Sequence, residues 1–346
     1  MDKSKHLNIG RRKFLKTSAL SVAALAAASN TKLFAQAPAV IKLPKKIVFK
    51  AATITNESYP YVDGFKFWKK LVEERTGGDV DFQIFHSASL GDERTINEGI
   101  LAGAIQAGVG AGAWAGFVPA YNTVQLPFLI RDIKHMYSLA DGVLGTKIAE
   151  QAEAKNFKVL GYYSAGDQHF QTRSKPIRTL ADFKGMKMRV IQNRAVIDGF
   201  RTLGAVPTPL PYPEIYTALQ QGTVDGTAND LLTVTLAKFY EVVKFFTWSS
   251  YVAEPRPLIM SKSYFDSLPA DFQKVLIDTA KQSAVFERKV FEDRSSGALE
   301  EAKKNGLTFV DLQDRDKWIE AVLPVWEQFG KATPGAAELI KIIQTS

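Results

Sequence analysis

The stretch Phe183-Lys184-Gly185-Met186-Lys187-Met188-Arg189-Val190 decides how the middle of this chain folds. Side chains of a β-strand point alternately to its two faces. Met186, Met188 and Val190 therefore share one apolar face of a short strand, and Lys187 and Arg189 lie on the other face. We expect Arg189 to project away from the methionine face.

A turn and further helices follow this strand. Gly204 is placed as the C-terminal cap of one helix, and Ile215 and Leu219 belong to the apolar stripe of the next. A polar loop over residues 225–230 comes after that helix. From residue 263 onward, apolar residues at helical spacing predict long C-terminal helices. The chain therefore alternates strand and helix before it ends in helices.

The same alternation occurs near the start of the chain. Residues 47–52 are apolar enough for a buried strand, and Phe65 and Trp68 begin a helical spacing that ends at a glycine pair. Residues 80–84 alternate apolar and polar side chains, and a second helix and another strand candidate follow, up to residue 111. This order predicts an α/β fold with a mainly parallel sheet, whose ligands bind at the carboxyl ends of the strands.

The first 37 residues have the layout of an export signal. Arg11 and Arg12 lie in a basic start, residues 17–29 are weakly apolar, and Ala35-Gln36-Ala37 follows. The apolar run is shorter than the roughly 20 residues that span a bilayer, so we expect no membrane anchor. The paired arginines resemble a twin-arginine signal, with an ordinary basic Sec-type signal as the alternative. We predict cleavage after Ala37 and a mature protein in the periplasm.

The composition narrows the possible functions. The 346 residues are 46% hydrophobic and 23% charged, with 44 Lys and Arg against 36 Asp and Glu. Cleavage after Ala37 removes seven cations and one anion, so the net charge falls from +8 to +2. Because no basic run with interleaved aromatic residues remains, we expect no nucleic-acid partner. The chain has no cysteine, which excludes a disulfide scaffold, a cysteine nucleophile and a thiolate metal site.

Signals for catalysis or for a cofactor are weak. Residues 108–112 are rich in glycine but lack the third glycine and the acidic partner of a dinucleotide-binding loop. His86, His135 and His169 do not have the spacing of paired metal ligands. We therefore expect no cofactor, no metal site and no enzymatic activity. A periplasmic α/β enzyme acting on a carboxylate stays open as an alternative.

Six short motifs occur in a fixed order between residues 90 and 226. They are Leu90-Gly91-Asp92-Glu93-Arg94, Leu126-Pro127-Phe128, residues 183–190, Leu203-Gly204-Ala205, residues 214–222 and Val224-Asp225-Gly226. In this order and spacing, the chain resembles the extracytoplasmic solute-binding proteins of tripartite ATP-independent periplasmic (TRAP) transporters, of the DctP type. The resemblance spans nearly all of the mature chain.

This resemblance implies a two-lobed, flytrap-like periplasmic binding protein with a mainly parallel sheet in each lobe. Lobe I would cover residues 45–170, completed by a return segment near 258–290, and lobe II would cover residues 171–257, completed by C-terminal helices to residue 346. The protein would be a monomer that binds a small organic acid anion and delivers it to the membrane subunits of a TRAP permease. A binding protein that serves a sensor kinase is a further alternative.

The resemblance also assigns ligand contacts to individual residues. Arg189 matches the arginine that holds the ligand carboxylate in this family. A planar guanidinium can donate two parallel hydrogen bonds to a carboxylate, which the ammonium group of lysine cannot do. Arg173 matches a second basic contact of sialic-acid-type members, with a solvated loop arginine as the equal alternative.

Two further candidates belong to the same lobe. Asn229 lies where relatives carry an asparagine, although Ala228 stands here for the usual Glu and Asp230 for the usual Pro. An amide can donate to a carboxylate and accept from a hydroxyl. Tyr212 occupies a position where similar proteins pack an aromatic ring on the ligand.

The remaining candidates are Glu93, Gln192 and Trp114. Glu93 matches an acidic position that accepts hydrogen bonds from ligand hydroxyls, although its place at a helix start gives it an equal structural role. Gln192 is a polar candidate three residues beyond Arg189, and Trp114 is a candidate apolar wall. No carboxylate lies near Ala111, where sugar-acid binders carry one, which favours a smaller hydroxy-, keto- or dicarboxylate, or an aromatic acid, over sialic acid.

Overall fold

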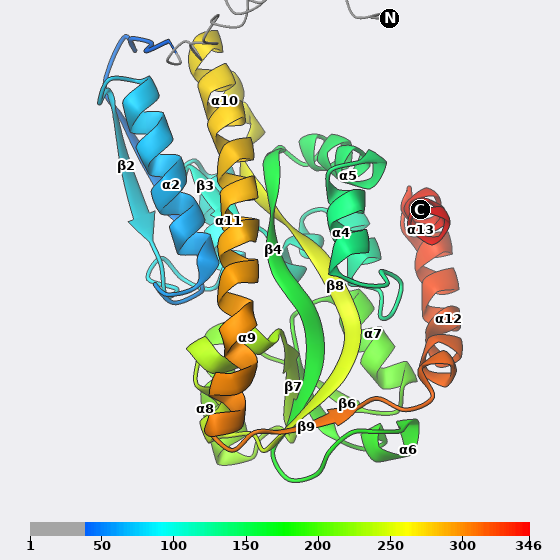
Figure 1. The fold of residues 1–346 in the computed structure, drawn as a ribbon. Coiled ribbons are helices and arrows are strands. Elements are labelled where there is room, and N and C mark those ends of the chain that lie inside the picture. The colour runs from blue at the N-terminus through cyan, green and yellow to red at the C-terminus, as the bar shows by residue number, and fades with distance from the viewer. Residues whose placement is uncertain (1–38) are drawn as a thin grey trace, which may run out of the picture. The chain divides into compact units, whose positions relative to one another are not determined.

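The computed structural model describes residues 39–346 (Figure 1). The predicted export signal, its twin-arginine pair and its cleavage site lie outside these residues. All of the elements named below belong to one compact unit, Val40–Ser346. Within this part of the chain, every helix is too short or too polar to cross a membrane.

One nine-stranded sheet organises this unit, in the order β2-β1-β3-β8-β4-β7-β5-β6, with β9 paired to β8. The predicted strand at residues 47–52 is confirmed as β1, and the strand that carries Arg189 is confirmed as β5. The strands are β1 (Ile47–Ala52), β2 (Val80–Phe85), β3 (Ala107–Val109), β4 (Phe157–Thr172), β5 (Lys187–Val190), β6 (Val206–Pro209), β7 (Gly226–Asn229), β8 (Phe245–Ser261) and β9 (Thr308–Asp311).

The sheet contains two parallel sets of strands. β1 pairs in parallel with β2 and β3, and β5 pairs in parallel with β6 and β7. β4 and β8, which are 16 and 17 residues long, pair with each other in antiparallel orientation and join the two sets. The predicted α/β class is confirmed, whereas the expected separate sheet in each lobe is not what the structure contains. The two sets form one sheet, because β3 pairs with β8 and β7 pairs with β4.

The pairing of β4 with β8 is interrupted where it passes between the two sets. Register shifts occur between Ser164 and Asp167 and between Gln168 and Phe170. Extra residues of this kind bend and twist a strand. Gly166 lies at the first interruption with a φ of +62°, and a Cβ atom there would come within 2.6 Å of the Phe291 ring. A glycine is therefore required for the helix that carries Phe291 to pack on the bend.

Helices cover the sheet along its length (Figure 1). The 35-residue helix α11 packs on α2, β4 and α9, and so contacts both halves of the sheet. α12 packs on α7, whereas α13 packs on α5, so the C-terminal helices also contact both halves. The helices are α2 (Pro60–Arg75), α3 (Glu93–Leu101), α4 (Ile133–Ala140), α5 (Val143–Glu153), α6 (Leu180–Phe183), α7 (Arg194–Thr202), α8 (Ile215–Gln221), α9 (Leu231–Leu236), α10 (Lys262–Asp266), α11 (Ala270–Lys304), α12 (Arg315–Ala332) and α13 (Ala336–Thr345), with the 3₁₀ helices η1 (Gly112–Gly116), η2 (Pro119–Gln125), η3 (Tyr212–Glu214) and η4 (Phe239–Glu241).

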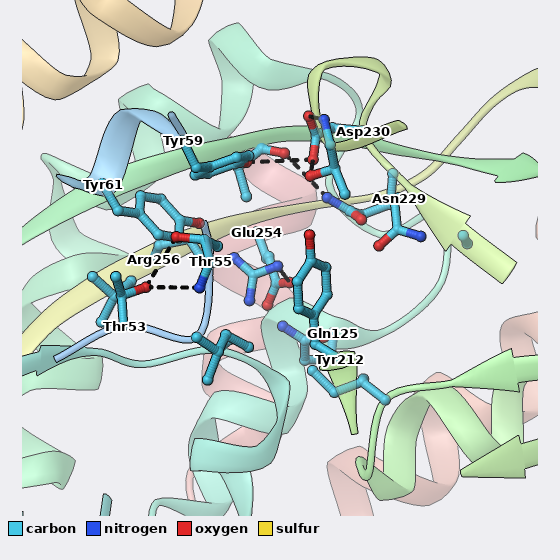
Figure 2. A pocket seen from close by; sticks show the side chains of 18 of the residues that line it. Thr53, Thr55, Tyr59, Tyr61, Gln125, Tyr212, Asn229, Asp230, Glu254 and Arg256 are labelled. Carbon is cyan, nitrogen blue, oxygen red and sulfur yellow. Dashed lines mark hydrogen bonds and ion pairs between the residues drawn. The ribbon is translucent and has the colours of Figure 1, made fainter. Parts of the chain in front are cut away.

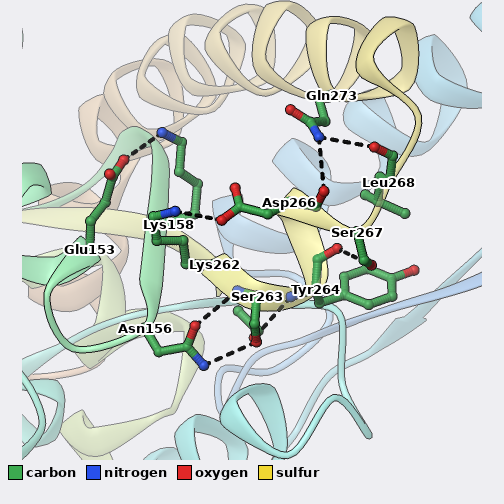
Figure 3. Close-up of polar contacts among 11 residues, drawn as sticks. Glu153, Asn156, Lys158, Lys262, Ser263, Tyr264, Asp266, Ser267, Leu268 and Gln273 are labelled. Atoms are coloured by element: carbon green, nitrogen blue, oxygen red, sulfur yellow. Dashed lines mark hydrogen bonds and ion pairs between the residues drawn. The ribbon is translucent and has the colours of Figure 1, made fainter.

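Polar contacts fix the turn from β8 into α11 (Figure 3). Asn156, just before β4, accepts a hydrogen bond from the backbone N–H of Ser263 at 2.8 Å and donates to the Ser263 hydroxyl at 3.1 Å. At the start of α11, the Gln273 amide donates to the carbonyl of Leu268 at 2.9 Å. These bonds tie the beginning of β4 to the end of β8, so the long helix starts from a fixed point.

Aromatic side chains fill the core between the first parallel set and α11. Trp68 on α2 is fully buried against Phe49 and Phe82, with ring centroids 5.4 and 5.3 Å away. Its indole N–H donates to the hydroxyl of Thr279 on α11 at 3.0 Å. The predicted helical spacing of Phe65 and Trp68 is thus confirmed as the buried face of α2.

Replacing this tryptophan tests the account of the core. We expect Trp68→Phe to lower the free energy of unfolding by about 1–3 kcal/mol, because it removes a buried hydrogen bond and leaves a cavity. Urea denaturation of the mature chain measures the change. The matched control is Trp248→Phe, at a tryptophan that is 36% exposed, for which we expect a change below about 0.5 kcal/mol. Equal losses in the two variants would contradict this account.

Candidate functional site

A cavity lies where the carboxyl ends of β1, β5 and β7 face the middle of β4 and β8 (Figure 2). This position agrees with the expectation for an α/β sheet. Its volume is about 80 Å³. The lining includes Thr53, Thr55, Tyr59, Tyr61 and Gln125 from the first half of the chain, Ala165, Gln168, Tyr251, Glu254 and Arg256 from β4 and β8, and Arg189, Tyr212, Ala228, Asn229, Asp230 and Thr233 from the segments between them.

Arg189 is the predicted carboxylate contact, and it lines this cavity. The residue is only 5% exposed, and its Nε donates to the carbonyl oxygen of Leu210 at 2.9 Å. Among residues 39–346, no Asp or Glu side chain forms an ion pair with Arg189. Burial lowers the pKa of Arg189 to about 10, which still leaves the guanidinium charged at neutral pH. A buried cation without an anionic partner is costly, so the site is suited to an anion.

Tyr212 and Asn229 also line the cavity, as expected from the sequence. Tyr212 lies in η3 and is half-buried. Asn229 ends β7, where its amide nitrogen makes long contacts to Thr227 Oγ1 and Gln171 Oε1, at 3.3 and 3.4 Å. These contacts are near the upper limit for a hydrogen bond. The Asn229 amide can therefore turn to a ligand at little cost.

Four of the predicted residues lie elsewhere than on this cavity. The Arg173 guanidinium packs over Gly222, where an added Cβ would meet its Nη1 at 2.7 Å. Trp114 is fully buried in the core, with its ring 5.0 Å from that of Tyr121. Gln192 is exposed and borders a smaller neighbouring cavity.

Glu93, the first residue of α3, is bonded to the protein through its carboxylate. Its Oε1 accepts hydrogen bonds from the backbone N–H groups of Ala111 and Trp114, at 2.7 and 3.1 Å, and so holds the start of η1. Burial raises the pKa of Glu93 to about 7, although Arg256 and these two N–H groups oppose the shift. Glu93 borders the same smaller cavity as Gln192 and lies outside the lining of the main cavity.

The structure adds two charged residues that the sequence analysis did not identify. Glu254 and Arg256 lie two positions apart on β8 and form an ion pair in the cavity wall. Glu254 Oε2 also accepts a hydrogen bond from the Tyr121 hydroxyl at 3.1 Å. Burial disfavours the charged form of Arg256, but the facing Glu254 outweighs this effect and raises the pKa of Arg256.

Asp230, at the start of α9, also lines the cavity. Its Oδ1 accepts the backbone N–H of Thr233 at 2.8 Å, so it caps the start of α9. Its Oδ2 lies 3.4 Å from the Tyr59 hydroxyl (Figure 2). Burial raises the pKa of Asp230 to about 6, although hydrogen bonds from Thr233 oppose the shift.

Hydroxyl groups line the side of the cavity formed by the first parallel set. Thr53 and Thr55 follow β1, and their hydroxyl oxygens lie 3.2 Å apart (Figure 2). Tyr59 and Tyr61 lie at the start of α2, and both are buried. The cavity therefore combines a free arginine, a paired arginine and many neutral hydrogen-bonding groups. Among residues 39–346, no group of three or more His, Asp or Glu side chains is placed to hold a metal ion.

Comparison with known proteins gives consistent matches along the chain. The family model for bacterial extracellular solute-binding proteins, family 7 (DctP), matches residues 51–332. The 2,3-diketo-L-gulonate-binding periplasmic protein YiaO of Escherichia coli is 30% identical over 329 residues, which cover 94% of this chain and 97% of that protein. The C4-dicarboxylate-binding periplasmic protein DctP of Rhodobacter capsulatus is 28% identical, covering 89% of this chain and 93% of that protein.

Solved structures give the same result. A TRAP periplasmic solute-binding protein from Sulfitobacter sp. NAS-14.1, with bound β-D-galacturonate, has a TM-score of 0.84 and 30% identity, covering 86% of this chain and 100% of that chain. A TRAP protein from Polaromonas sp. JS666, bound to D-erythronate, has a TM-score of 0.82 and 31% identity, covering 86% of this chain and 98% of that chain.

The raised pKa of Glu93 predicts how stability depends on pH. The folded state binds the proton of the Glu93 carboxyl more tightly than the unfolded state does. The contribution of Glu93 to the free energy of unfolding is therefore greatest below pH 4.5 and falls as the pH rises to about 7. Between pH 4.5 and about 7, we expect the Glu93→Gln variant to lose up to about 3 kcal/mol less unfolding free energy than the unmodified protein, because the amide cannot ionise. Urea denaturation between pH 4.5 and 7.5 measures it.

The control for this prediction is Glu98→Gln on the same helix, where the side chain is 53% exposed. We expect the pH dependence of that variant to follow the unmodified protein. If Glu93→Gln leaves the slope between pH 4.5 and 7 unchanged, the protonation assigned to Glu93 is wrong.

Proposed function

Because the chain belongs to the bacterial extracellular solute-binding proteins of family 7, the DctP family, we propose that it binds a small organic acid in the periplasm and delivers it to the membrane subunits of a TRAP permease. One observation carries the proposal at the level of the site. The buried guanidinium of Arg189 lines the cavity and has no carboxylate partner among residues 39–346. An acid anion would supply that partner.

Arg189 is the residue that we propose as the carboxylate clamp. Its Nε is already held by the carbonyl of Leu210, which fixes the plane of the guanidinium. The terminal N–H groups can then donate to both oxygens of one carboxylate, an arrangement that gives short and directional hydrogen bonds. Tyr212 would pack on the ligand, and the Asn229 amide would bond to its carboxylate or to a hydroxyl.

Closure of two lobes on the ligand is the proposed mechanism of capture. We keep the lobe boundaries expected from the sequence, residues 45–170 with a return near 258–290, and residues 171–257 with the C-terminal helices. The ligand favours closure because it contacts residues from both parallel sets only when the lobes are together. The interruptions of the β4 and β8 pairing near Ser164 and Gln168 support a bend at this point.

The named relatives support an acid as the ligand. The solved structures described above hold galacturonate and erythronate, and each of these molecules has one carboxylate and several hydroxyls. Because both of these solved structures are of TRAP periplasmic solute-binding proteins, neither a periplasmic enzyme nor a binding protein that serves a sensor kinase is favoured. We also propose that the mature protein is a monomer without enzymatic activity and does not bind nucleic acid.

Arg189→Lys tests the clamp. We expect its affinity for the cognate acid to fall about tenfold to a hundredfold, because the ammonium group loses the paired hydrogen bonds. The acid is first found by a thermal-shift screen of residues 38–346 against uronates, hydroxy acids, dicarboxylates and aromatic acids, and calorimetric titration then gives its affinity. Arg173→Lys is the matched control, since Arg173 lies off the cavity, and its affinity should stay within about twofold. An unchanged affinity in Arg189→Lys would rule out the clamp.

Export through the twin-arginine route, with cleavage after Ala37, is a separate part of the proposal. We expect replacement of Arg11 and Arg12 by lysine to keep the precursor in the cytoplasm, because this route reads the arginine pair itself. Cell fractionation with blotting measures the distribution, and Lys13→Arg serves as the control. Unimpaired export of the double variant would instead indicate the Sec route.

A further inference from the structure

Glu254 and Arg256 place a second polar group in the cavity. The two residues flank Pro255 on β8, so their side chains lie on the same face of the strand, and both line the cavity (Figure 2). Glu254 is 3% exposed. The cavity therefore contains two arginines, of which Arg256 is paired with a carboxylate and Arg189 is not.

This pair has hydrogen-bonding capacity that the protein does not use. A guanidinium carries five N–H donors. The Arg256 Nε is buried and has no partner among the described residues, while one terminal nitrogen contacts Glu254. A buried donor without a partner is costly. An oxygen atom of a ligand would satisfy it.

The charges in the cavity wall determine which oxygen fits. Glu254 balances Arg256, and Asp230 adds a second carboxylate on the same cavity. Only the charge of Arg189 is therefore left for a ligand carboxylate. A second ligand carboxylate would lie among Glu254 and Asp230 and be repelled, whereas a hydroxyl can accept from Arg256 and donate to either carboxylate.

The neutral groups around the Glu254–Arg256 pair also favour ligand hydroxyls over a second carboxylate. The hydroxyls of Thr53, Thr55, Tyr59 and Tyr61 line the adjoining wall, and each can both donate and accept. Because they carry no positive charge at neutral pH, they do not compensate a second anion. They offer partners for several hydroxyls in a row.

We propose that the Glu254–Arg256 pair is a specificity determinant, which selects acids with one carboxylate and several hydroxyls over dicarboxylates. This inference rests on the proposed function, since it takes Arg189 as the contact of the single carboxylate. The pair binds the hydroxylated end of the acid, and it excludes a second carboxylate by charge.

Two matched pairs of acids test the proposal by calorimetric titration of the mature chain. D-erythronate and meso-tartrate both have four carbons and carry hydroxyls, and D-galacturonate and galactarate both have six carbons and four carbon atoms between their ends. In each pair only the second acid has two carboxylates. We expect the unmodified protein to bind at least one of the two monocarboxylates, and to bind it at least about tenfold more tightly than its dicarboxylate counterpart.

Glu254→Gln then tests the pair itself. We expect the affinity for the monocarboxylate to fall about tenfold and the preference over the dicarboxylate to narrow, because the repelling charge is gone. Arg256→Lys is a second variant, which keeps the charge balance. It should lower the affinity for the hydroxylated monocarboxylate, but the protein should still bind this acid more tightly than the dicarboxylate. Asp271→Asn, at an exposed position on α11, is the control and should change neither quantity. Melting temperatures show whether each variant is folded.

The outcomes separate this inference from the proposed function. Arg189→Lys should lower the affinity for both acids of a pair by the same factor, whereas Glu254→Gln should change the ratio of the two affinities. If Arg189→Lys weakens binding but folded Glu254→Gln and Arg256→Lys variants leave affinity and ratio unchanged, the specificity role is wrong and the clamp stands. A dicarboxylate that binds as tightly as its monocarboxylate counterpart also overturns the role. If no acid of either pair binds but another acid of the thermal-shift screen does, the specificity role is wrong and the proposed function stands; if no acid of the whole screen binds, the proposed function fails as well.

Discussion

The passage of β4 and β8 through both parallel sets is the constraint on which the rest of the structure depends. These two antiparallel strands bring the carboxyl ends of β1, β5 and β7 to face one cavity, although the strands come from distant parts of the chain. They also carry lining residues of their own, including Gln168, Glu254 and Arg256. The same two strands therefore connect the halves and form the wall of the site, and α11 follows them along both halves.

The chemistry of the site follows from a difference between its two arginines, because only one of them forms an ion pair within the protein. Arg189 is held through its Nε by a backbone carbonyl and has no described carboxylate beside it, while Arg256 is balanced by Glu254. A buried cation without a partner favours an anion, and a balanced pair favours neutral oxygen atoms. The proposed subsites, one for a carboxylate and one for neutral oxygen atoms, therefore lie at a distance set by the sheet. In this account the site binds an acid through charge and hydrogen bonds, and no side chain has to react with it.

Much of the fold could be predicted from the sequence because local signals were strong. The apolar run in residues 47–52, the alternation in residues 183–190 and the glycine caps each specified an element that the structure contains. Arg189, Tyr212 and Asn229 could be predicted as site residues because they stand at positions that match motifs of a known family, and all three line the cavity. β4 and β8 had no such signal. β8 contains Pro255 and Pro257, and proline argues against a central strand. Glu254 and Arg256 were missed for that reason. The burial of Glu93 beside Ala111 and of Trp114 against Phe157 depends on contacts distant in sequence, which could not be predicted either.

A crystal structure of the mature chain with D-galacturonate or D-erythronate tests the central claim most directly, namely that Arg189 holds the carboxylate and the Glu254–Arg256 pair faces the hydroxyls. The account predicts both carboxylate oxygens within hydrogen-bonding distance of the Arg189 guanidinium, and at least one ligand hydroxyl bonded to Arg256 or Glu254. A carboxylate bound to Arg256 instead, with Arg189 bonded only to protein or water, would contradict it.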